Sequence, residues 1–389
     1  MLKNNSLYYI FIFTFISFTS NLFAGTSTTG EDKLYAVKST GGSTQSFGTV
    51  DPTDGSFTTI KTTISPTGLG WPLGDIGTEP DPINGLIFTR QTNSGTNDIL
   101  AIKKSDGSTN WLGLTGNDLV VGFDSKLNRL IFRRSDTKIM AYDMSDNTTS
   151  TIKDGFTTDT NWQAGGIGAV DSFNRKIFQL KTSGSEAKKL YITDADNGST
   201  SSIQLTGNEF VSIAFDSKEQ KLYGLQSDGS GAYDIVHINY DNNTQTNLTS
   251  SGIFNGMSNY VQVIAPNDQR YYVQESPTTI RAVSLVDGTS LGTFASILRL
   301  FPVGDVIVGT NDNSSETVTH TINDPTSNIV KRGWGYTNYT GRNYSYGYTR
   351  IMYGRMAINN LFENSRVRVY SGATLEGTGT VGGITNDDN

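Results

Sequence analysis

Short runs in which hydrophobic and polar residues alternate fill most of the chain, and this period of two predicts β-strands. One unit recurs: a strand that ends near Asp, a short polar turn, and an apolar strand rich in aromatic residues. Its clearest copies are VVGFDSKLNRLIF, IGAVDSFNRKIF and SIAFDSKEQKLY at residues 120–132, 167–178 and 212–223. Weaker copies lie at 75–88 and 262–273, and half a copy, DKLYAV, lies at 32–37.

A second pair of strands follows each copy and is joined by an Asx-Gly-like turn. Examples are AIKKSDGSTNWL at residues 101–112 and VSLVDGTSLGTF at 283–294. Asp-Gly between alternating residues favours a tight hairpin, because type I′ turns need positive φ at both central positions. Each unit therefore holds four strands in about 43 to 53 residues, which is the period of a β-propeller blade.

A single four-stranded sheet cannot bury both of its faces, but sheets that pack face to face around an axis can. The sequence therefore predicts an all-β, six-bladed β-propeller over residues 25–312. Seven blades, a β-sandwich and a β-solenoid are the alternatives. Because DVIVGTND at 305–312 is similar to the inner strand DLVVGFDS at 118–125, we expect it to close the ring beside Leu34 and Tyr35.

Composition restricts the function. The chain has 389 residues, with 30 Lys and Arg against 37 Asp and Glu, so its formal net charge is −7. Nucleic-acid binding needs a basic face, so nucleic acid is not expected as a partner. The chain has no Cys, which excludes disulfides and thiolate metal sites. Secreted eukaryotic proteins of this size usually carry disulfides, so a bacterial origin is favoured.

Residues 1–24 have the features of a signal peptide. Lys3 precedes an apolar stretch at 7–18, and Ala24 offers a small residue before an expected cut ahead of Gly25. An uncleaved membrane anchor is the alternative, but the stretch is shorter than the roughly 20 residues that cross a bilayer. We therefore expect an exported chain whose mature form is a monomer without a transmembrane span.

The repeat resembles the six-bladed YWTD propellers of lipoprotein receptors. The likeness is clearest in NDQRYYVQESPTTIRAVSLVDGTS at residues 267–290, which follows the order Asp-Pro, Tyr-Trp-Thr-Asp and Leu-Asp-Gly of that family. Here the Trp and the Thr-Asp are missing. The resemblance implies a binding platform rather than an enzyme.

Residues 313–363 break the period and are expected to form a Tyr- and Arg-rich linker or packed extension. Aromatic rings beside cations can stack on sugars or bases, or dock on an anionic surface. The alternative is that the rings pack on the propeller, since Tyr is common in strands. The candidate ligand-binding residues in this segment are Trp334, Tyr336, Arg342, Tyr344 and Arg350.

The segment NSRVRVYSGATLEGTGTVGGIT at residues 364–385 resembles the β-solenoid passengers of Gram-negative autotransporters. This resemblance implies a short solenoid over 364–389 and a location outside a Gram-negative cell, on its surface, or in its periplasm. A lone rung would leave an unpaired strand edge, so we expect this end to be poorly ordered.

Catalytic motifs are missing: the sequence contains no nucleophile elbow, P-loop or HExxH pattern, and no catalytic residue is assigned. Aligned inner strands place Asp75, Asp118 and Asp305 at one position of three adjacent blades. If Asp305 closes the ring, these carboxylates converge at one mouth of the channel and could hold Ca²⁺. This layout resembles that of propeller lactonases. The alternative is that the three Asp residues simply begin strands and face solvent.

The function predicted from the sequence is a secreted or surface-associated binding module, similar to an adhesin or an autotransporter passenger. Its expected partner is an extracellular glycan, protein or peptide. A metal-dependent propeller hydrolase that uses Asp75, Asp118 and Asp305 is one alternative, and a structural envelope protein is another.

Overall fold

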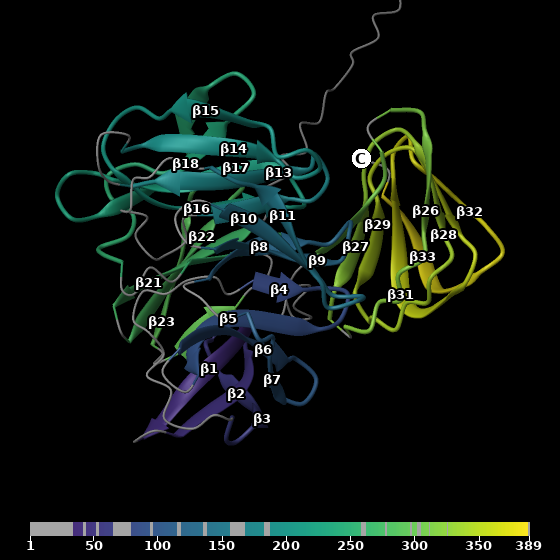
Figure 1. Cartoon of the computed structure of the whole chain (residues 1–389), viewed down its shortest axis with the longest axis horizontal. Helices are drawn as coiled ribbons and strands as arrows, with labels where there is room; N and C mark the ends of the chain where they lie inside the picture. The colour runs from purple at the N-terminus through teal and green to yellow at the C-terminus, as the bar shows by residue number, and fades with distance from the viewer. Residues whose placement is uncertain are drawn as a thin grey trace, which may run out of the picture.

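The computed structural model describes residues 34–387 apart from 42–43, 52–53, 65–78, 94–95, 115–117, 135–137, 156–167, 183–186, 258–261, 277, 296–297, 302–304, 311 and 325. Every regular element within the described residues is a β-strand, and the strands build two consecutive domains, residues 34–301 and 305–387 (Figure 1). The expected signal peptide at 1–24 lies outside this range. No described helix has the length and apolarity needed to span a membrane.

The first domain is the predicted six-bladed β-propeller, built from six antiparallel four-stranded sheets. The inner strands of consecutive blades lie against one another, as expected for a ring. They are β4 (Glu79–Asp81), β8 (Leu119–Asp124), β12 (Gly168–Asp171), β16 (Phe210–Asp216), β20 (Gln262–Ala265) and β24 (Leu298–Phe301). The second strands are β1 (Leu34–Gly41), β5 (Leu86–Asn93), β9 (Arg129–Arg134), β13 (Lys176–Lys181), β17 (Lys221–Ser227) and β21 (Arg270–Ser276).

The two outer strands of each blade complete the sheets. The third strands are β2 (Thr44–Val50), β6 (Thr96–Lys103), β10 (Lys138–Asp143), β14 (Lys189–Asp194), β18 (Tyr233–Asn239) and β22 (Thr279–Ser284). The fourth strands are β3 (Phe57–Lys61), β7 (Thr109–Trp111), β11 (Thr149–Lys153), β15 (Thr200–Gln204), β19 (Thr244–Asn247) and β23 (Ser290–Ala295).

The ring closes by pairing of its last strand with its first, as predicted, but a different segment makes the closure. Strand β24 pairs antiparallel with β1, and Tyr35 lies opposite Phe301. The expected segment at 305–312 instead contributes β25 (Asp305–Val308), which pairs in parallel with β27 (Asn328–Lys331) in the second domain. A short apolar run fits a propeller strand and a solenoid strand equally well, so the similarity at 305–312 could not decide between them.

Asp residues at the ends of inner strands shape the turns that follow. In the second blade, Asp81 Oδ1 accepts hydrogen bonds from the backbone N–H of Ile83 (2.8 Å) and Asn84 (2.9 Å). Burial raises the pKa of this fully covered carboxyl to about 6. The turn ends at Gly85 with φ of 71°, where most side chains would be strained. An Asp at the equivalent position makes such a turn contact in the third, fourth and fifth blades, as Asp124, Asp171 and Asp216.

The second domain is a three-sided parallel β-solenoid. Its first sheet holds β25, β27, β29 (Tyr348–Ile351), β31 (Leu361–Tyr370) and β33 (Thr380–Asp387). Its second sheet holds β26 (Ser315–Val318), β28 (Tyr336–Tyr339), β30 (Arg355–Ile358) and β32 (Thr374–Glu376). A third, shorter ladder joins Ile322 to Asn343 and the start of β31 to the start of β33.

Inward-facing residues of the solenoid stack from rung to rung. Val306, Ile329 and Val367 occupy one column of the first sheet and are buried. Across the interior, the rings of Tyr339 and Phe362 meet edge to face at 4.9 Å. The segment 313–363, expected to be a linker or packed extension, supplies the central rungs. Residues 364–387 stack on these rungs and therefore do not stand alone.

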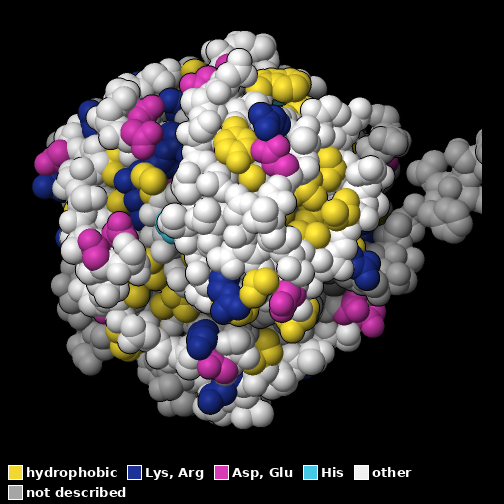
Figure 2. Space-filling model, turned by 90° about the vertical axis from the view of Figure 1, so that its right-hand side faces the viewer, with side chains coloured by type: hydrophobic (Ala, Val, Ile, Leu, Met, Phe, Trp, Pro, Cys, Tyr) yellow, Lys and Arg dark blue, Asp and Glu magenta, His cyan; other side chains and the backbone are white. Residues whose placement is uncertain are grey.

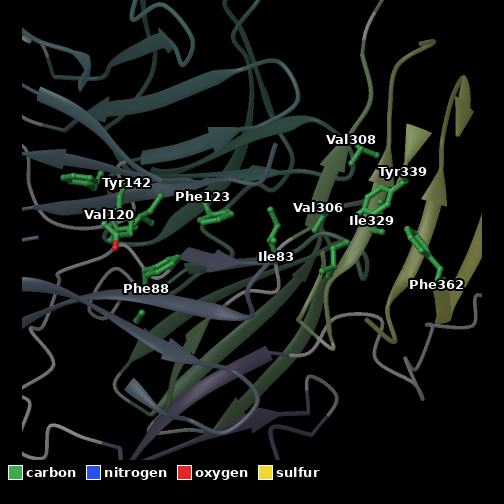
Figure 3. Close-up of a cluster of buried hydrophobic side chains, with 14 of the residues drawn as sticks. Ile83, Phe88, Val120, Phe123, Tyr142, Val306, Val308, Ile329, Tyr339 and Phe362 are labelled. Carbon is green, nitrogen blue, oxygen red and sulfur yellow. The ribbon is translucent and has the colours of Figure 1, made fainter. Parts of the chain in front are cut away.

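Both domains share one hydrophobic cluster. It runs from Phe88 and Phe123 in the ring through Ile83 to Val306 and Ile329 in the solenoid (Figure 3). The solenoid covers the face of the ring that carries the turns between inner and second strands. At this junction, the backbone N–H of Asn323 donates to the carbonyl of Ile83 at 2.8 Å.

Polar contacts fix the junction further. Lys104 Nζ lies 2.6 Å from Asp324 Oδ2, and both side chains are fully buried. The backbone N–H of Ile307 donates to Ser125 Oγ at 3.2 Å, and Lys126 Nζ donates to the carbonyl of Gly309 at 2.9 Å. Because these contacts come from different blades, the solenoid is anchored across the ring rather than tethered at one point.

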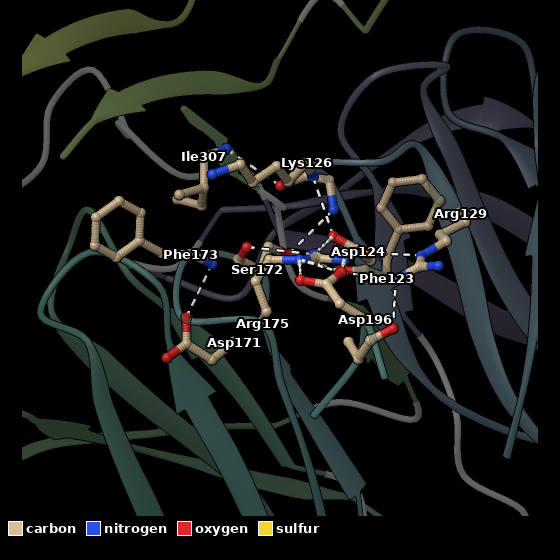
Figure 4. A network of polar contacts seen from close by, with 12 residues as sticks. Phe123, Asp124, Lys126, Arg129, Asp171, Ser172, Phe173, Arg175, Asp196 and Ile307 are labelled. Atoms are coloured by element: carbon tan, nitrogen blue, oxygen red, sulfur yellow. Dashed lines mark hydrogen bonds and ion pairs between the residues drawn. The ribbon is translucent and has the colours of Figure 1, made fainter. Parts of the chain in front are cut away.

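An ion-pair network between the third and fourth blades positions the turn at residues 125–128 (Figure 4). The buried carboxylate of Asp124 contacts Arg129 Nε at 2.8 Å and Arg175 Nη1 at 2.5 Å. Arg175 also reaches Asp196 at 2.8 Å. The network holds Ser125 and the adjacent backbone in the place where the solenoid docks.

Candidate functional site

The predicted carboxylate cluster requires Asp305 to sit on an inner strand of the ring, and the structure places it elsewhere. Asp305 begins β25 and accepts hydrogen bonds from Ser217 Oγ at 2.9 Å and Asn267 Nδ2 at 3.2 Å. Both donors belong to turns on the covered face of the ring. Asp305 therefore helps to attach the solenoid.

Asp118 lies at the opposite end of the inner strands. It precedes β8, whose far end leads into the turn that docks the solenoid. A six-residue strand is about 20 Å long, so the structure does not bring Asp118 and Asp305 together. Asp118 instead pairs with Arg134, whose Nη2 lies 3.0 Å from its carboxylate. Asp75 lies outside the described residues, and no cluster of three metal-ligating side chains occurs within them.

Arg350 is buried in the structure and cannot contact a ligand at the surface. It lies on β29 in register with Val330, and both point away from the solenoid interior. The side chain of Arg350 is completely covered. Its guanidinium lies 5.1 Å from the centre of the Tyr348 ring.

Arg342 and Tyr344 contact each other near the third ladder. Arg342 Nη1 donates to Tyr344 Oη at 3.0 Å, and the guanidinium lies 5.4 Å from the ring centre. Tyr344 is 46% exposed, and the neighbouring Tyr346 is 71% exposed. These residues share the surface but lie at a different edge of the solenoid from Trp334.

Trp334 and Tyr353 form an exposed aromatic pair on adjacent rungs. They occupy the turns that connect the first sheet to the second, and their ring centres lie 5.4 Å apart at an angle of 49°. Trp334 is 64% exposed and Tyr353 is 42% exposed. Large aromatic side chains are often covered, and here two exposed rings contact each other on neighbouring turns.

A polar triad continues from this pair onto the second sheet. The guanidinium of Arg355 lies 5.4 Å from the ring centre of Tyr336 and makes an ion pair with Glu376 at 2.9 Å. We call Trp334, Tyr336, Tyr353, Arg355 and Glu376 the aromatic corner. Seen from the solenoid side, hydrophobic and charged side chains lie in small groups within a broad uncharged polar surface (Figure 2).

Glycine allows the two aromatic turns to stack closely. Gly354 has φ of 67°, and a Cβ atom there would lie 2.6 Å from the carbonyl oxygen of Gly333 in the rung below. Any larger residue would therefore push the two turns apart. The sequence signal is the recurrence of an aromatic residue followed by Gly, as WG and YG, on successive rungs.

Lys331 ties the same two turns together from inside. Its ammonium donates to the carbonyls of Arg332 (2.7 Å), Gly333 (2.7 Å) and Tyr353 (3.2 Å). Burial lowers the pKa of Lys331 to about 8, and nearby Glu316 offsets part of this effect. Because its ammonium bonds to the backbone of both turns, Lys331 positions the pair.

The binding residues predicted from the sequence include Trp334 and Tyr336 of the aromatic corner but not Tyr353, Arg355, Glu376 or the supporting Lys331. These residues come together only because solenoid rungs stack in parallel, with Tyr336 in register with Arg355. The structure thus defines a six-bladed propeller joined to a parallel β-solenoid that exposes an aromatic pair.

Solved structures share the ring. A chain in the crystal structure of a nidogen/laminin complex is similar with TM-score 0.50 and 12% identity, covering 69% of this chain and 96% of that one. TolB from Acinetobacter baumannii is similar with TM-score 0.49 and 15% identity, covering 69% of this chain and 66% of that one. At these identities the likeness to the first shows the propeller fold alone. No protein-family model and no curated protein matches the sequence.

Proposed function

We propose that this chain is an exported binding module, similar to an adhesin or autotransporter passenger, in which the propeller supports a ligand-binding solenoid. The observation that carries this proposal is the exposed Trp334–Tyr353 pair on a rigid corner. An exposed aromatic pair costs solubility and contributes little to folding, so its use is best explained by a partner that covers it.

Export and location rest on the sequence. The features of residues 1–24 support a signal peptide, and the C-terminal resemblance supports a surface-associated or periplasmic place in a Gram-negative cell. The partner would be an extracellular glycan, protein or peptide. The solenoid covers the face of the ring that carries the turns between inner and second strands. The solenoid surface and the opposite face of the ring are therefore available for contact with a partner.

The test is a binding screen of the mature chain on arrays of purified glycans, extracellular matrix proteins and peptides. The double variant Trp334→Ala/Tyr353→Ala should lose binding by about tenfold or more, as aromatic contacts at the centre of an interface usually do. Tyr346→Ala is the matched control, because it removes an exposed ring at another edge of the solenoid. Absence of any partner, or equal loss in both variants, would contradict the proposal.

A further inference from the structure

We infer that the aromatic corner binds an uncharged saccharide, an inference that rests on the proposed function and names the ligand class of the same surface. Sugar rings have apolar C–H faces and polar hydroxyl edges. A site that fits a sugar therefore offers aromatic rings to the C–H faces and paired hydrogen-bond donors and acceptors to the hydroxyl groups.

The aromatic faces come from two rungs. Trp334 and Tyr353 are inclined to each other by 49°, so together they form an angled surface rather than a flat stack. Both rings are held by backbone that is itself fixed: Gly354 packs against Gly333, and Lys331 bonds to carbonyls of both turns. A surface that is already ordered loses little entropy when a ligand binds.

The polar groups lie on the second sheet, beside the ring of Tyr336. Arg355 is in register with Tyr336, and its side chain is 60% exposed. Only its Nη2 is engaged with Glu376 among the described residues, so further guanidinium donors face solvent. Glu376, 33% exposed, supplies acceptors. A sugar hydroxyl group both donates and accepts hydrogen bonds, so it can bond to Arg355 and Glu376 at the same time.

The charge of the surface favours a neutral ligand. Arg355 and Glu376 neutralise each other, and the neighbouring outward positions of the second sheet carry the uncharged Ser315, Asn338 and Thr374. An anionic polymer would need several cations in a row. A peptide that adds a strand would need a sheet edge, whereas Trp334 and Tyr353 lie on the turns of the two central rungs.

The experiment uses the mature full chain with neutral oligosaccharides of glucose, mannose, galactose and N-acetylglucosamine, read by calorimetry. At least one should bind, and its affinity should stay within about twofold between about 50 and about 500 mM salt, because no counterions are released. Trp334→Ala and Tyr353→Ala should each weaken binding by about tenfold, and Glu376→Gln by several-fold. Tyr346→Ala should leave it unchanged.

The outcomes separate the two proposals. If a protein or a peptide binds and Trp334→Ala removes that binding while no saccharide binds, the saccharide inference is wrong and the binding function stands. A steep loss of affinity with salt would identify an anionic ligand and would also overturn the inference. If no probe binds, or if binding ignores both aromatic variants, the proposed function and the inference fall together.

Discussion

The ring and the solenoid differ in whether they expose aromatic residues: among the described residues, both bury some, but only the solenoid displays large aromatic side chains at its surface. In the ring, Tyr271 and Tyr272 are almost completely buried between blades. Its exposed large hydrophobic residues among those described are aliphatic, namely Leu127, Val286 and Leu291. In the solenoid, Trp334, Tyr344, Tyr346 and Tyr353 are exposed on turns and edges.

The difference follows from how each domain hides its core. A blade is covered on both faces by neighbouring blades, so aromatic residues on its strands are enclosed by the ring. A solenoid encloses its inward-facing residues, and its outward positions and corners are free wherever the ring does not cover them. The ring is therefore a rigid mount, and the solenoid is the part that can display side chains without weakening its core.

Breaking the junction between the two domains should have the largest effect. Lys104→Met leaves the buried Asp324 carboxylate without its 2.6 Å partner and should lower the free energy of unfolding by about 3–5 kcal/mol. Burial alone would raise the pKa of Asp324, but Lys104 holds it below its usual value. Chemical denaturation of both proteins at neutral pH would measure the loss.

The double variant Lys104→Met/Asp324→Leu provides the control for this prediction. Replacing both charges by apolar groups should recover most of the stability, because neither is then left unpaired. Since the folded pKa of Asp324 is depressed, the pair should contribute above about pH 4 and be lost as the pH falls through the folded value. Equal stability of wild type and Lys104→Met would contradict the anchoring role of the pair.

Removing an ion pair between two blades of the ring should have the next largest effect on stability. Asp124→Ala removes the carboxylate that joins Arg129 to Arg175 and should cost about 2–3 kcal/mol by denaturation. The control is Asp146→Ala, which removes an exposed Asp from the tip of a hairpin turn and should change stability by about 0.5 kcal/mol or less. A similar loss of stability in Asp124→Ala and Asp146→Ala would show that the ion pairs between the blades do not stabilise the ring.

Deprotonation of Lys331 should affect only the solenoid corner. Its pKa is about 8 in the folded chain against an ordinary value of 10.5, so the folded protein gives up this proton first as the pH rises. Between these values the unfolded chain binds more protons, so this group makes stability rise with pH even while the ammonium contacts to the two turns are lost. The ¹⁹F NMR signal of 5-fluorotryptophan at Trp334 should shift with a midpoint near pH 8.

Lys331→Met is the matching variant, since it keeps the length of the side chain and removes its charge. The midpoint near pH 8 should disappear, and the Trp334 signal should resemble that of wild type at high pH. A titration that persists in Lys331→Met would assign the pH response to another group.

The smallest effect on stability should come from the aromatic corner itself. Trp334→Ala removes a ring that is 64% exposed, so the free energy of unfolding should change by about 0.5 kcal/mol or less. Chemical denaturation of Trp334→Ala, measured together with its ligand binding, would show whether the ring serves ligand contact or packing of the core. A large loss of stability would mean that Trp334 serves the core, contrary to the contrast between the two domains.

The ring was predictable because each blade repeats the same local chemistry. Asp124, Asp171 and Asp216 end inner strands at matching places, and hairpins with Asx-Gly-like turns follow. The strand that closes the ring was not predictable, because Leu298–Phe301 and Asp305–Val308 are both short apolar runs close together in the chain. Only the hydrogen-bond pattern, antiparallel for one and parallel for the other, tells them apart.

The site was predictable only in part. Trp334, Tyr336 and Arg350 were predicted as binding residues because aromatic and cationic residues interleave in this segment. The structure buries Arg350, and the sequence does not say which face of a sheet is covered. The solenoid rungs at 313–363 differ in length and lack a strict repeat, so these residues were predicted to form a linker or packed extension. The partners Tyr353, Arg355 and Glu376 depend on the register between rungs, which no local pattern contains.

The position of β24 has a mechanical consequence. This strand is the seam of the ring, and the solenoid begins directly after it at Asp305. A force that pulls on the aromatic corner therefore passes along the backbone into the seam, while the buried junction at Lys104 and Asp324 carries part of the same load. The molecule would resist tension as long as the junction holds, and once it fails the ring would be opened by peeling β24 from β1.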